Sequence, residues 1–323
     1  MKLAFLNKLF KASTAALLSL SMIMLFCDKT EADSLNGLPT VTVGKSLSSG
    51  QRKETIAILT QEISGQNYTT LTVTGNDLVK YLNPSGYNFT TTSGVWSSAL
   101  IVKTDSEPGI RVKILPYNGQ TTITTITADQ YKNAALTAGI ENADIYITSP
   151  VAIDGSGALA GIYAAYADKG KKLNQDQINA AQDEINTLSS INQNNRNKSN
   201  FSDAKLNRAI VGAKKDMAQK GGTLSDDQIR DIINNQIKIN HLGNTINNNQ
   251  INEIVKLLEE VQGSGSLKNK SFVGNAQALS HDFQNIKNKI LKSQNNSNVS
   301  HNNNFLNDLW NQIVGFFNKL FNN

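Results

Sequence analysis

The segment "ADIYITSPVAIDGSGALAGIYAAYAD", residues 143–168, indicates the fold class of the first half of the chain. Residues 143–149 are an apolar run with β-branched side chains, which predicts a buried β-strand. Residues 155–168 form a helical pattern rich in small residues, which allow a helix to approach a sheet closely. A further helical pattern spans residues 127–138. This helix–strand–helix order predicts a sheet that helices cover.

Similar patterns before this segment extend the prediction to an α+β or α/β domain over residues 33–185. They predict helices and strands in the order helix 51–63, strand 68–73, helix 74–82, strand 95–104 and strand 109–115. We expect the last two strands to pair with each other, because the Ser-Glu-Pro-Gly sequence at residues 106–109 is typical of a turn.

The pattern Gly-x-x-[Leu/Ile]-[Ser/Asn]-x-x-Gln occurs four times and is typical of a helix start. The copies begin at Gly44, Gly170, Gly221 and Gly243. The Ser or Asn is a good N-cap, and the Gln three residues later completes a capping box. In the last three copies a helical pattern precedes the glycine, which is then expected to end that helix. The second half of the chain is therefore predicted to consist of short helices joined by such corners.

The first copy also resembles a phosphate-binding loop, since Gly44-Lys45-Ser46 follows a strand-like run. That motif requires a second glycine five residues earlier, where this chain has Pro39. Proline has no backbone N–H to offer a phosphate. The sequence therefore excludes a nucleotide site here, and we expect no cofactor.

After residue 185 we expect a helical region at 186–262, with an Asn-rich linker or loop at 189–200. Residues 263–304 then contain a Gly/Ser hinge, a short helix and a second Asn-rich linker. The short helix has apolar residues at heptad spacing, which predicts that it packs on its neighbours. These residues are Phe272, Ala276, Leu279, Phe283, Ile286 and Ile290.

Residues 305–323 are predicted to form an amphipathic helix with one broad apolar stripe. The stripe could dock on the protein itself, lie in a membrane interface, or bind another protein. Only Lys319 provides a cation on the polar face, so attraction to anionic lipid would be weak. The residues predicted to make membrane or partner contacts are Leu306, Leu309, Trp310, Ile313, Phe316, Phe317, Leu320 and Phe321.

Residues 1–32 have the pattern of a secretory signal peptide, with basic residues followed by an apolar stretch at 15–26. That stretch is shorter than the roughly 20 residues that span a bilayer. Small residues before the expected cut predict cleavage near Ala32. We therefore expect a secreted, extracellular protein that is either free or retained at the cell surface.

The single cysteine, Cys27, lies in this leader, so the rest of the chain is expected to form no disulfide. Phe26 is too large for the usual lipid-attachment motif. A secreted protein without disulfides suits a Gram-positive exterior. Four of the 31 Lys and Arg and two of the 26 Asp and Glu lie in residues 1–32, so the remainder carries a net charge of +3. That charge is too small to indicate a nucleic-acid partner.

Candidate sites for chemistry are few. His241, His281 and His301 have no neighbouring ligand pattern, so no metal site is expected. Asp144 and Asp154 flank the apolar strand and are the basis for one alternative, a carboxylate-dependent hydrolase of the envelope.

The second candidate is a polar-ligand site formed by Asp154, Gly155, Ser156 and Gly157, where a helix begins after a strand. Free backbone N–H groups at such a helix start can bind an anion. The competing interpretation is a plain helix cap.

Residues 128–174 resemble the YpuA-like family of predicted secreted proteins from Gram-positive bacteria, a domain of unknown function. The resemblance rests on the residues Tyr131, Asn133, Thr137, Ala138, Gly139, Ile140, Ala143, Pro150, Gly155, Ser156, Ala158, Leu159, Gly161 and Ile162. It extends to the helices near residue 260 and covers most of the chain after the leader. It implies an exported protein, and it supplies no catalytic residue.

Together these patterns favour an exported, non-catalytic binding or structural protein of the cell envelope or extracellular space. The ligand is unknown, with a membrane surface or a cell-wall component as candidate partners. One alternative is a membrane-surface protein that acts through its C-terminal amphipathic helix. The other is the carboxylate-dependent hydrolase.

Overall fold

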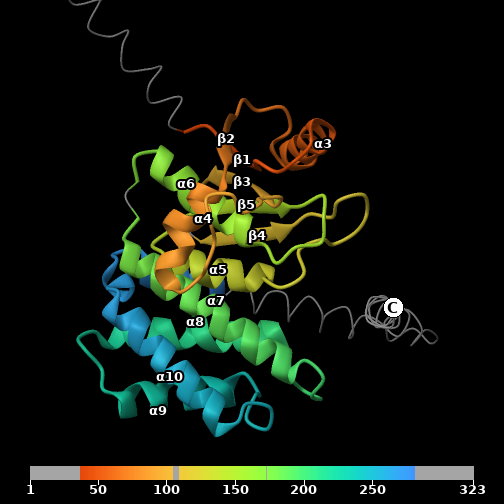
Figure 1. The fold of residues 1–323 in the computed structure, drawn as a ribbon. Helices are drawn as coiled ribbons and strands as arrows, with labels where there is room; N and C mark the ends of the chain where they lie inside the picture. The colour runs from red at the N-terminus through yellow and green to blue at the C-terminus, as the bar shows by residue number, and fades with distance from the viewer. Residues whose placement is uncertain (1–36, 105–108, 172, 281–323) are drawn as a thin grey trace, which may run out of the picture. The chain divides into compact units, whose positions relative to one another are not determined.

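The computed structural model describes residues 37–104, 109–171 and 173–280 (Figure 1). The predicted signal peptide, most of the helix with heptad spacing and the predicted C-terminal amphipathic helix lie outside these residues. The described residues all belong to one compact unit.

The first half contains five strands and five α-helices among its described residues. Their bounds are β1 Thr40–Gly44, α3 Ser49–Thr60, β2 Thr69–Val73, α4 Gly75–Leu82, β3 Ser98–Lys103, β4 Ile110–Ile114, α5 Ala128–Thr137, β5 Ala143–Thr148 and α6 Ser156–Asp168, with 3₁₀ turns η1 Gln61–Ile63 and η2 Asn83–Ser85. The fifth helix, α7, spans Gln175–Asn195 and continues into the second half. The predicted α+β class is confirmed.

The strands form one mixed sheet in the order β2-β1-β3-β5-β4. β1 is parallel to β2 and β5 is parallel to β4, whereas β3 is antiparallel to both β1 and β5. The predicted hairpin between 95–104 and 109–115 is therefore wrong, because β5 lies between β3 and β4. β5 is the more apolar strand and takes the interior position, while β4 carries Arg111 and Lys113 and lies at an edge.

Helices cover both faces of the sheet (Figure 1). α3 packs on one face through Leu59, against Val43 and Leu100. α5 and α6 pack on the opposite face, α6 over β1, β2 and β3 and α5 over β4. The small residues of α6 explain its close approach, since a Cβ at Gly161 would lie 2.7 Å from the Thr42 hydroxyl oxygen.

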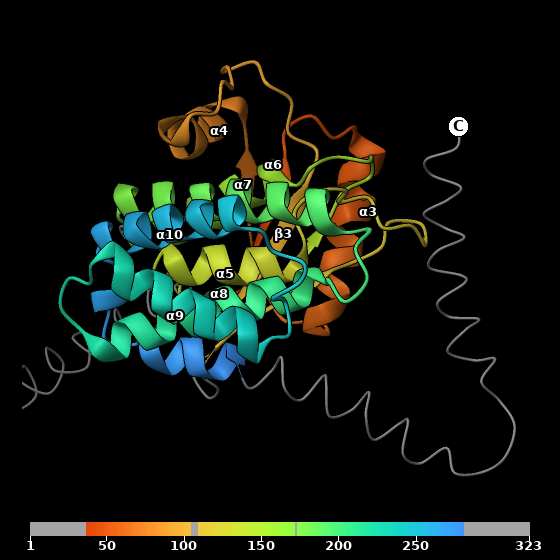
Figure 2. The ribbon, with the colours of Figure 1, turned by 90° about the horizontal axis from the view of Figure 1, so that it is seen from below.

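The second half is a stack of helices beside α5 (Figure 2). It contains α8 Asp203–Lys220, α9 Asp226–Ile239, α10 Asn248–Gly263 and the 3₁₀ turn η3 Ser266–Lys268, and a further helix begins at residue 272. The Asn-rich linker predicted at 189–200 is wrong over most of its length, because α7 continues to Asn195. Ile191 is buried there, and the Asn195 amide bonds to the Ile191 carbonyl, so the helix accommodates its asparagine.

The repeated corners form helix starts as their sequence predicts. Ser48, Ser225 and Asn247 each make a capping box with the glutamine three residues later, and Asn174 caps α7 through the N–H of Asp176. The fourth corner differs from the prediction, since α9 ends at Ile239 and not at Gly243. His241 takes the left-handed conformation, with φ of 55°. This turns the chain so that Leu242 is buried and its backbone N–H donates to the Ile237 carbonyl at 2.9 Å.

The two halves share a buried polar contact on α5, α7 and α8. The Lys214 ammonium donates to both oxygens of Glu184 at 2.8 and 3.1 Å and to the Thr137 hydroxyl at 3.0 Å. The side chains of Lys214 and Glu184 are both fully buried. α7 runs across the expected boundary at residues 185 and 186, and the described residues on both sides of it belong to one compact unit.

Candidate functional site

The strands β1, β2, β4 and β5 run in the same direction, so their carboxyl ends lie together at one end of the sheet. Open α/β sheets usually bind their ligands at this end. Residues 90–97 pack across it. A Cβ at Gly44 would lie 2.3 Å from the Val95 carbonyl oxygen, and one at Gly75 would lie 2.4 Å from that of Thr91. Glycine is therefore required there for backbone contact within the chain and not for a phosphate.

The predicted polar-ligand site at residues 154–157 lies at the same end of the sheet. Asp154 accepts hydrogen bonds from the Ser156 backbone N–H at 3.1 Å and from its hydroxyl at 2.5 Å. The Ala158 N–H donates to the Ser97 hydroxyl at 2.8 Å, and Gly155 has a φ of 109°. A Cβ at Gly157 would lie 2.8 Å from the same hydroxyl oxygen. These contacts favour the competing interpretation, a helix cap that the protein completes itself.

Asp144 and Asp154 are not brought together. Asp144 lies near the start of β5, opposite Val102, and forms an ion pair with Arg111 at 2.5 Å. Asp154 lies beyond the other end of β5, next to the N-terminus of α6. Four residue steps along a strand span roughly 13 Å, which exceeds the separation of the carboxyl pair in glycosidases. The geometry does not support the hydrolase alternative.

The residues predicted for membrane or partner contact, from Leu306 to Phe321, lie outside the described part of the chain. Within the described ranges, no helix has both the length and the apolar character needed to cross a membrane. The same ranges contain no group of three or more His, Cys, Asp or Glu side chains that could hold a metal ion.

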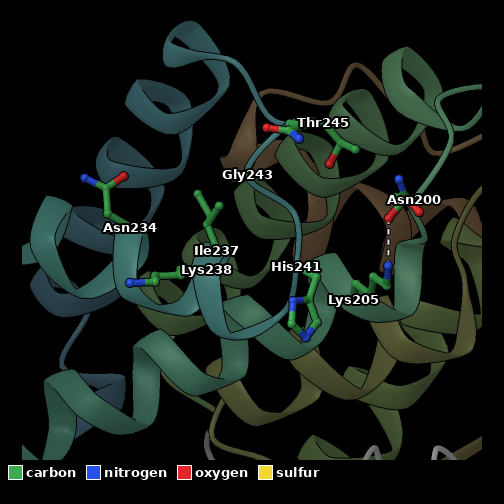
Figure 3. A pocket seen from close by; sticks show the side chains of 9 residues that line it. Asn200, Lys205, Asn234, Ile237, Lys238, His241, Gly243 and Thr245 are labelled. Atoms are coloured by element: carbon green, nitrogen blue, oxygen red, sulfur yellow. Dashed lines mark hydrogen bonds between the residues drawn. The ribbon is translucent and has the colours of Figure 1, made fainter.

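The structure instead brings basic side chains together around a pocket of about 480 Å³ in the helical half (Figure 3). The pocket lies between the start of α8, the end of α9 and the loop that leads to α10. Three of its residues carry or can carry a positive charge, and none is an aspartate or a glutamate. We call it the basic pocket, and its residues are Asn200, Lys205, Asn234, Ile237, Lys238, His241, Gly243, Asn244 and Thr245.

Helix geometry explains one side of the basic pocket. Asn234, Ile237, Lys238 and His241 follow the spacing of one helix face, i, i+3, i+4 and i+7, although His241 lies just past the end of α9. Ile237 is buried in the helical core and fixes the position of this face. Figure 3 shows Asn200 and Lys205 on the other side, with His241 between the two sides.

Hydrogen bonds position the lysines around the loop. The Lys205 ammonium donates to the Asn200 backbone carbonyl at 2.8 Å, which leaves it further N–H donors for a ligand. Lys198 donates to the carbonyl of the pocket residue Thr245 at 2.9 Å. A third ammonium group, and a fourth basic side chain, therefore lies beside the pocket.

The backbone adds to the positive potential. α8 and α10 begin close to the pocket, with N-caps Ser202 and Asn247, and the N-terminus of a helix carries partial positive charge. The C-terminus of α9 opposes this effect, and Lys238 in its last turn compensates. Asn200 and His241 both have left-handed backbone conformations, with φ of 71° and 55°. Asn and His adopt this conformation readily at turns and helix ends, so here it shapes the loops that line the pocket.

Little in the sequence indicates the basic pocket. Its residues come from three segments, and their polar character resembles that of the surrounding Asn-rich sequence. The sequence shows no ligand pattern near His241, and the conformation of this residue depends on how Leu242 packs. The pocket depends on the packing of α8, α9 and the following loop, which a helical pattern does not specify.

Comparisons with known proteins identify the family of the chain. The family model described as "Protein of unknown function (DUF1002)" matches residues 43–279. The chain belongs to the DUF1002 family. The matched region includes all residues of the basic pocket and nearly the whole sheet. It includes neither the predicted leader nor the predicted C-terminal helix.

Among the curated proteins, this DUF1002 chain is similar to "Uncharacterized protein YpuA" of Bacillus subtilis (strain 168). The two are 29% identical over 177 residues, which is 54% of this chain and 58% of YpuA. The resemblance to YpuA-like proteins is therefore confirmed, and the similarity spans little more than half of either protein. No solved structure matches the chain.

Proposed function

We propose that this DUF1002 protein is an exported binding protein of the cell envelope or extracellular space. Its ligand presents a phosphate or carboxylate group to the basic pocket. One observation carries the proposal: Lys205, Lys238 and His241 surround a pocket without a lining carboxylate, beside the N-termini of two long helices. Complementary charge and helix dipoles favour an anion at such a place.

Binding is tested by titrating the full-length protein with inorganic phosphate and with succinate at low salt, using calorimetry. The variant Lys238→Gln removes one exposed cation of the basic pocket. We expect its affinity to be about fivefold lower, because one charge interaction at close range in water contributes about 1 kcal/mol. The difference should shrink as salt is added, since salt screens exposed charges.

The matched control is Lys53→Gln, which removes an exposed lysine from the helix α3, outside the basic pocket. It should bind both anions as the wild type does. Equal weakening in the two variants, or saturable binding of neither anion by the wild type, would contradict the proposal.

The export part of the proposal is supported by residues 1–32, where Lys2, Lys8 and Lys11 precede an apolar stretch. Cells that express the full chain should release it into the medium or hold it at the surface, without residues 1–32. A chain that lacks residues 1–32 should remain inside the cells. Equal distribution of both chains between cells and medium would contradict export.

A second candidate function is supported by the apolar stripe of residues 305–321. In this alternative the protein acts at a membrane surface, and the stripe provides the contact. The double variant Trp310→Ala/Phe317→Ala should then lose binding to lipid vesicles. If the double variant binds vesicles as the wild type does, the membrane function is wrong.

A further inference from the structure

A second pocket, of about 440 Å³, lies at the end of the sheet opposite to residues 90–97. It is located where β1 begins, where β3 ends and beside the last turn of α6. We call it the lower pocket. Its lining residues are Leu38, Thr40, Ile101, Lys103, Gly139, Glu141, Ala165, Tyr166, Lys169, Lys171 and Leu173.

The inner part of the lower pocket is apolar. Ile101 of β3 and Ala165 of α6 are buried apolar lining residues, and the neighbouring Thr40 of β1 is buried with its hydroxyl hydrogen-bonded to that of Thr69 at 3.1 Å. Leu38 and Leu173 are only partly buried and extend the apolar lining outward. The basic pocket has only Ile237 as a large apolar residue, so the two pockets differ in chemical character.

The outer part of the lower pocket is cationic. Lys103, Lys169 and Lys171 outnumber the single carboxylate, Glu141, which accepts a hydrogen bond from the Ser271 hydroxyl. The Tyr166 hydroxyl adds a polar group and donates to the Glu141 backbone carbonyl at 3.2 Å.

Helix stability explains part of this charge but not all of it. Lys169 and Lys171 follow the C-terminus of α6, where cations are favourable whether or not a ligand binds. Lys103 ends β3, and Lys169 donates to the Thr69 hydroxyl at 3.4 Å, so both lysines also make contacts within the protein. The combination of three lysines with an apolar interior therefore indicates a ligand with two chemically different parts.

We propose that the lower pocket binds a single-chain amphipathic anion, an alkyl chain that carries a carboxylate or phosphate head. The alkyl chain lies between Leu38, Ile101 and Leu173, and the head lies among the lysines. The volume is within the range of about 300–1,000 Å³ that small-molecule pockets have. A small inorganic anion would not cover the apolar lining, and a neutral apolar molecule would carry no charge to complement the lysines. This site is separate from the basic pocket and from the function proposed for it.

The test uses the full-length protein and four probes below their aggregation limits: decanoate, decyl phosphate, decanol and inorganic phosphate. Calorimetry should show that decanoate and decyl phosphate bind with one-to-one stoichiometry and that decanol binds at least about tenfold more weakly. Inorganic phosphate should not displace decanoate, because the phosphate site proposed above is the basic pocket. Equal affinity for decanol and decanoate, or no binding of either anionic amphiphile, would overturn the proposal.

Two substitutions assign the binding to the lower pocket. Lys171→Glu reverses an exposed charge near the proposed head group and should lower the affinity for decanoate at least about tenfold. Leu173→Gln should lower the affinities for decanoate and decyl phosphate by similar factors. The control Lys53→Glu makes the same charge change on α3 and should leave both affinities unchanged. Unfolding midpoints show whether each variant is folded, and wild-type affinity in both folded pocket variants would also overturn the proposal.

Discussion

Lys214 and Glu184 form an ion pair whose side chains are both fully buried, between helices of the two halves of the chain. Burial lowers the pKa of Lys214, and the contact with Glu184 opposes that effect. A charge buried in this way is stable only while its partner and its hydrogen bonds remain. Thr137 completes the contact by donating its hydroxyl hydrogen to Glu184 at 2.6 Å.

We expect Lys214→Met to lower the free energy of unfolding by about 3–5 kcal/mol, because Glu184 is left buried without its cation. The double variant Lys214→Met/Glu184→Gln should recover a large part of this loss. Lys113→Met, which breaks an exposed pair with Glu62, should cost less than about 1 kcal/mol. Denaturant titration measures all three, and equal losses for the buried and exposed lysines would contradict this account.

Asp203, the first residue of α8, gives the protein a pH-dependent stability. Burial raises the pKa of its carboxyl from the ordinary value of 3.8 to about 6, although the Thr127 hydroxyl donates to it at 2.6 Å. Between these two pH values the folded chain binds more protons than the unfolded chain. The contribution of Asp203 therefore makes stability fall as pH rises from about 4 to about 6.

Asp203→Asn should remove this decline, which amounts to at most about 3 kcal/mol. The measurement is the free energy of unfolding at a series of pH values between 4 and 7. Asp227→Asn, which removes an exposed carboxylate from the first turn of α9, controls for the loss of a negative charge at a helix start. An unchanged slope in Asp203→Asn would show that this carboxyl titrates normally.

At the residue scale, local contacts could be predicted from the sequence and long-range contacts could not. The N-caps Ser48, Ser225 and Asn247 were predictable, because a cap and its glutamine are three residues apart. Lys214 and Glu184 are usually solvent-exposed residue types, and they lie 30 residues apart. Neither local pattern nor composition indicates that the two would be buried together.

At the scale of elements, glycines allow residues 90–97 to pack closely across the carboxyl ends of the parallel strands. Gly75→Ala should destabilise the protein by about 1–3 kcal/mol, because the new methyl group would collide with backbone atoms of Thr90 and Thr91. Gly50→Ala is the matched change, in the first turn of α3, where a Cβ meets no atom within 4 Å. It should stabilise by about 0.5–1 kcal/mol. Thermal unfolding of both variants checks the contrast, and equal effects would contradict it.

The elements themselves were largely predictable, whereas their pairing was not. β5 and α6 were predicted from their apolar and small residues, and both occur close to the expected bounds. The hairpin between β3 and β4 was wrong, because a turn sequence does not exclude a more apolar strand from a position between them. The linker before residue 200 was wrong because burial of Ile191 outweighs the weak helix preference of asparagine.

At the scale of the molecule, the described residues behave as one structural unit. A fragment of residues 37–185 would cut α7 after half its length and expose the α5 surface that packs on α7 and α8. We expect this fragment not to unfold cooperatively, whereas a fragment of residues 37–280 should. Circular dichroism during thermal unfolding distinguishes the two, and cooperative unfolding of the shorter fragment would show that the halves are separate domains.

The basic pocket is the site that depends most on this whole arrangement, since it needs α8, α9 and the loop before α10 in place. Sequence patterns identified the helices but not the pocket, because Lys205 and His241 come together only through tertiary packing. The site predicted at residues 154–157 had a clear local pattern. Its polar groups bond within the protein.

The central claim is that the basic pocket binds an anion, and the imidazole of His241 reports on it most directly. The chain has three histidines, and His241→Asn identifies the proton signals of this one. Addition of inorganic phosphate at constant ionic strength and pH should shift the His241 signals in a saturable manner. The shift should need higher phosphate concentrations in the double variant Lys205→Gln/Lys238→Gln. Signals that do not respond to phosphate, or that respond equally in the double variant, would contradict the claim.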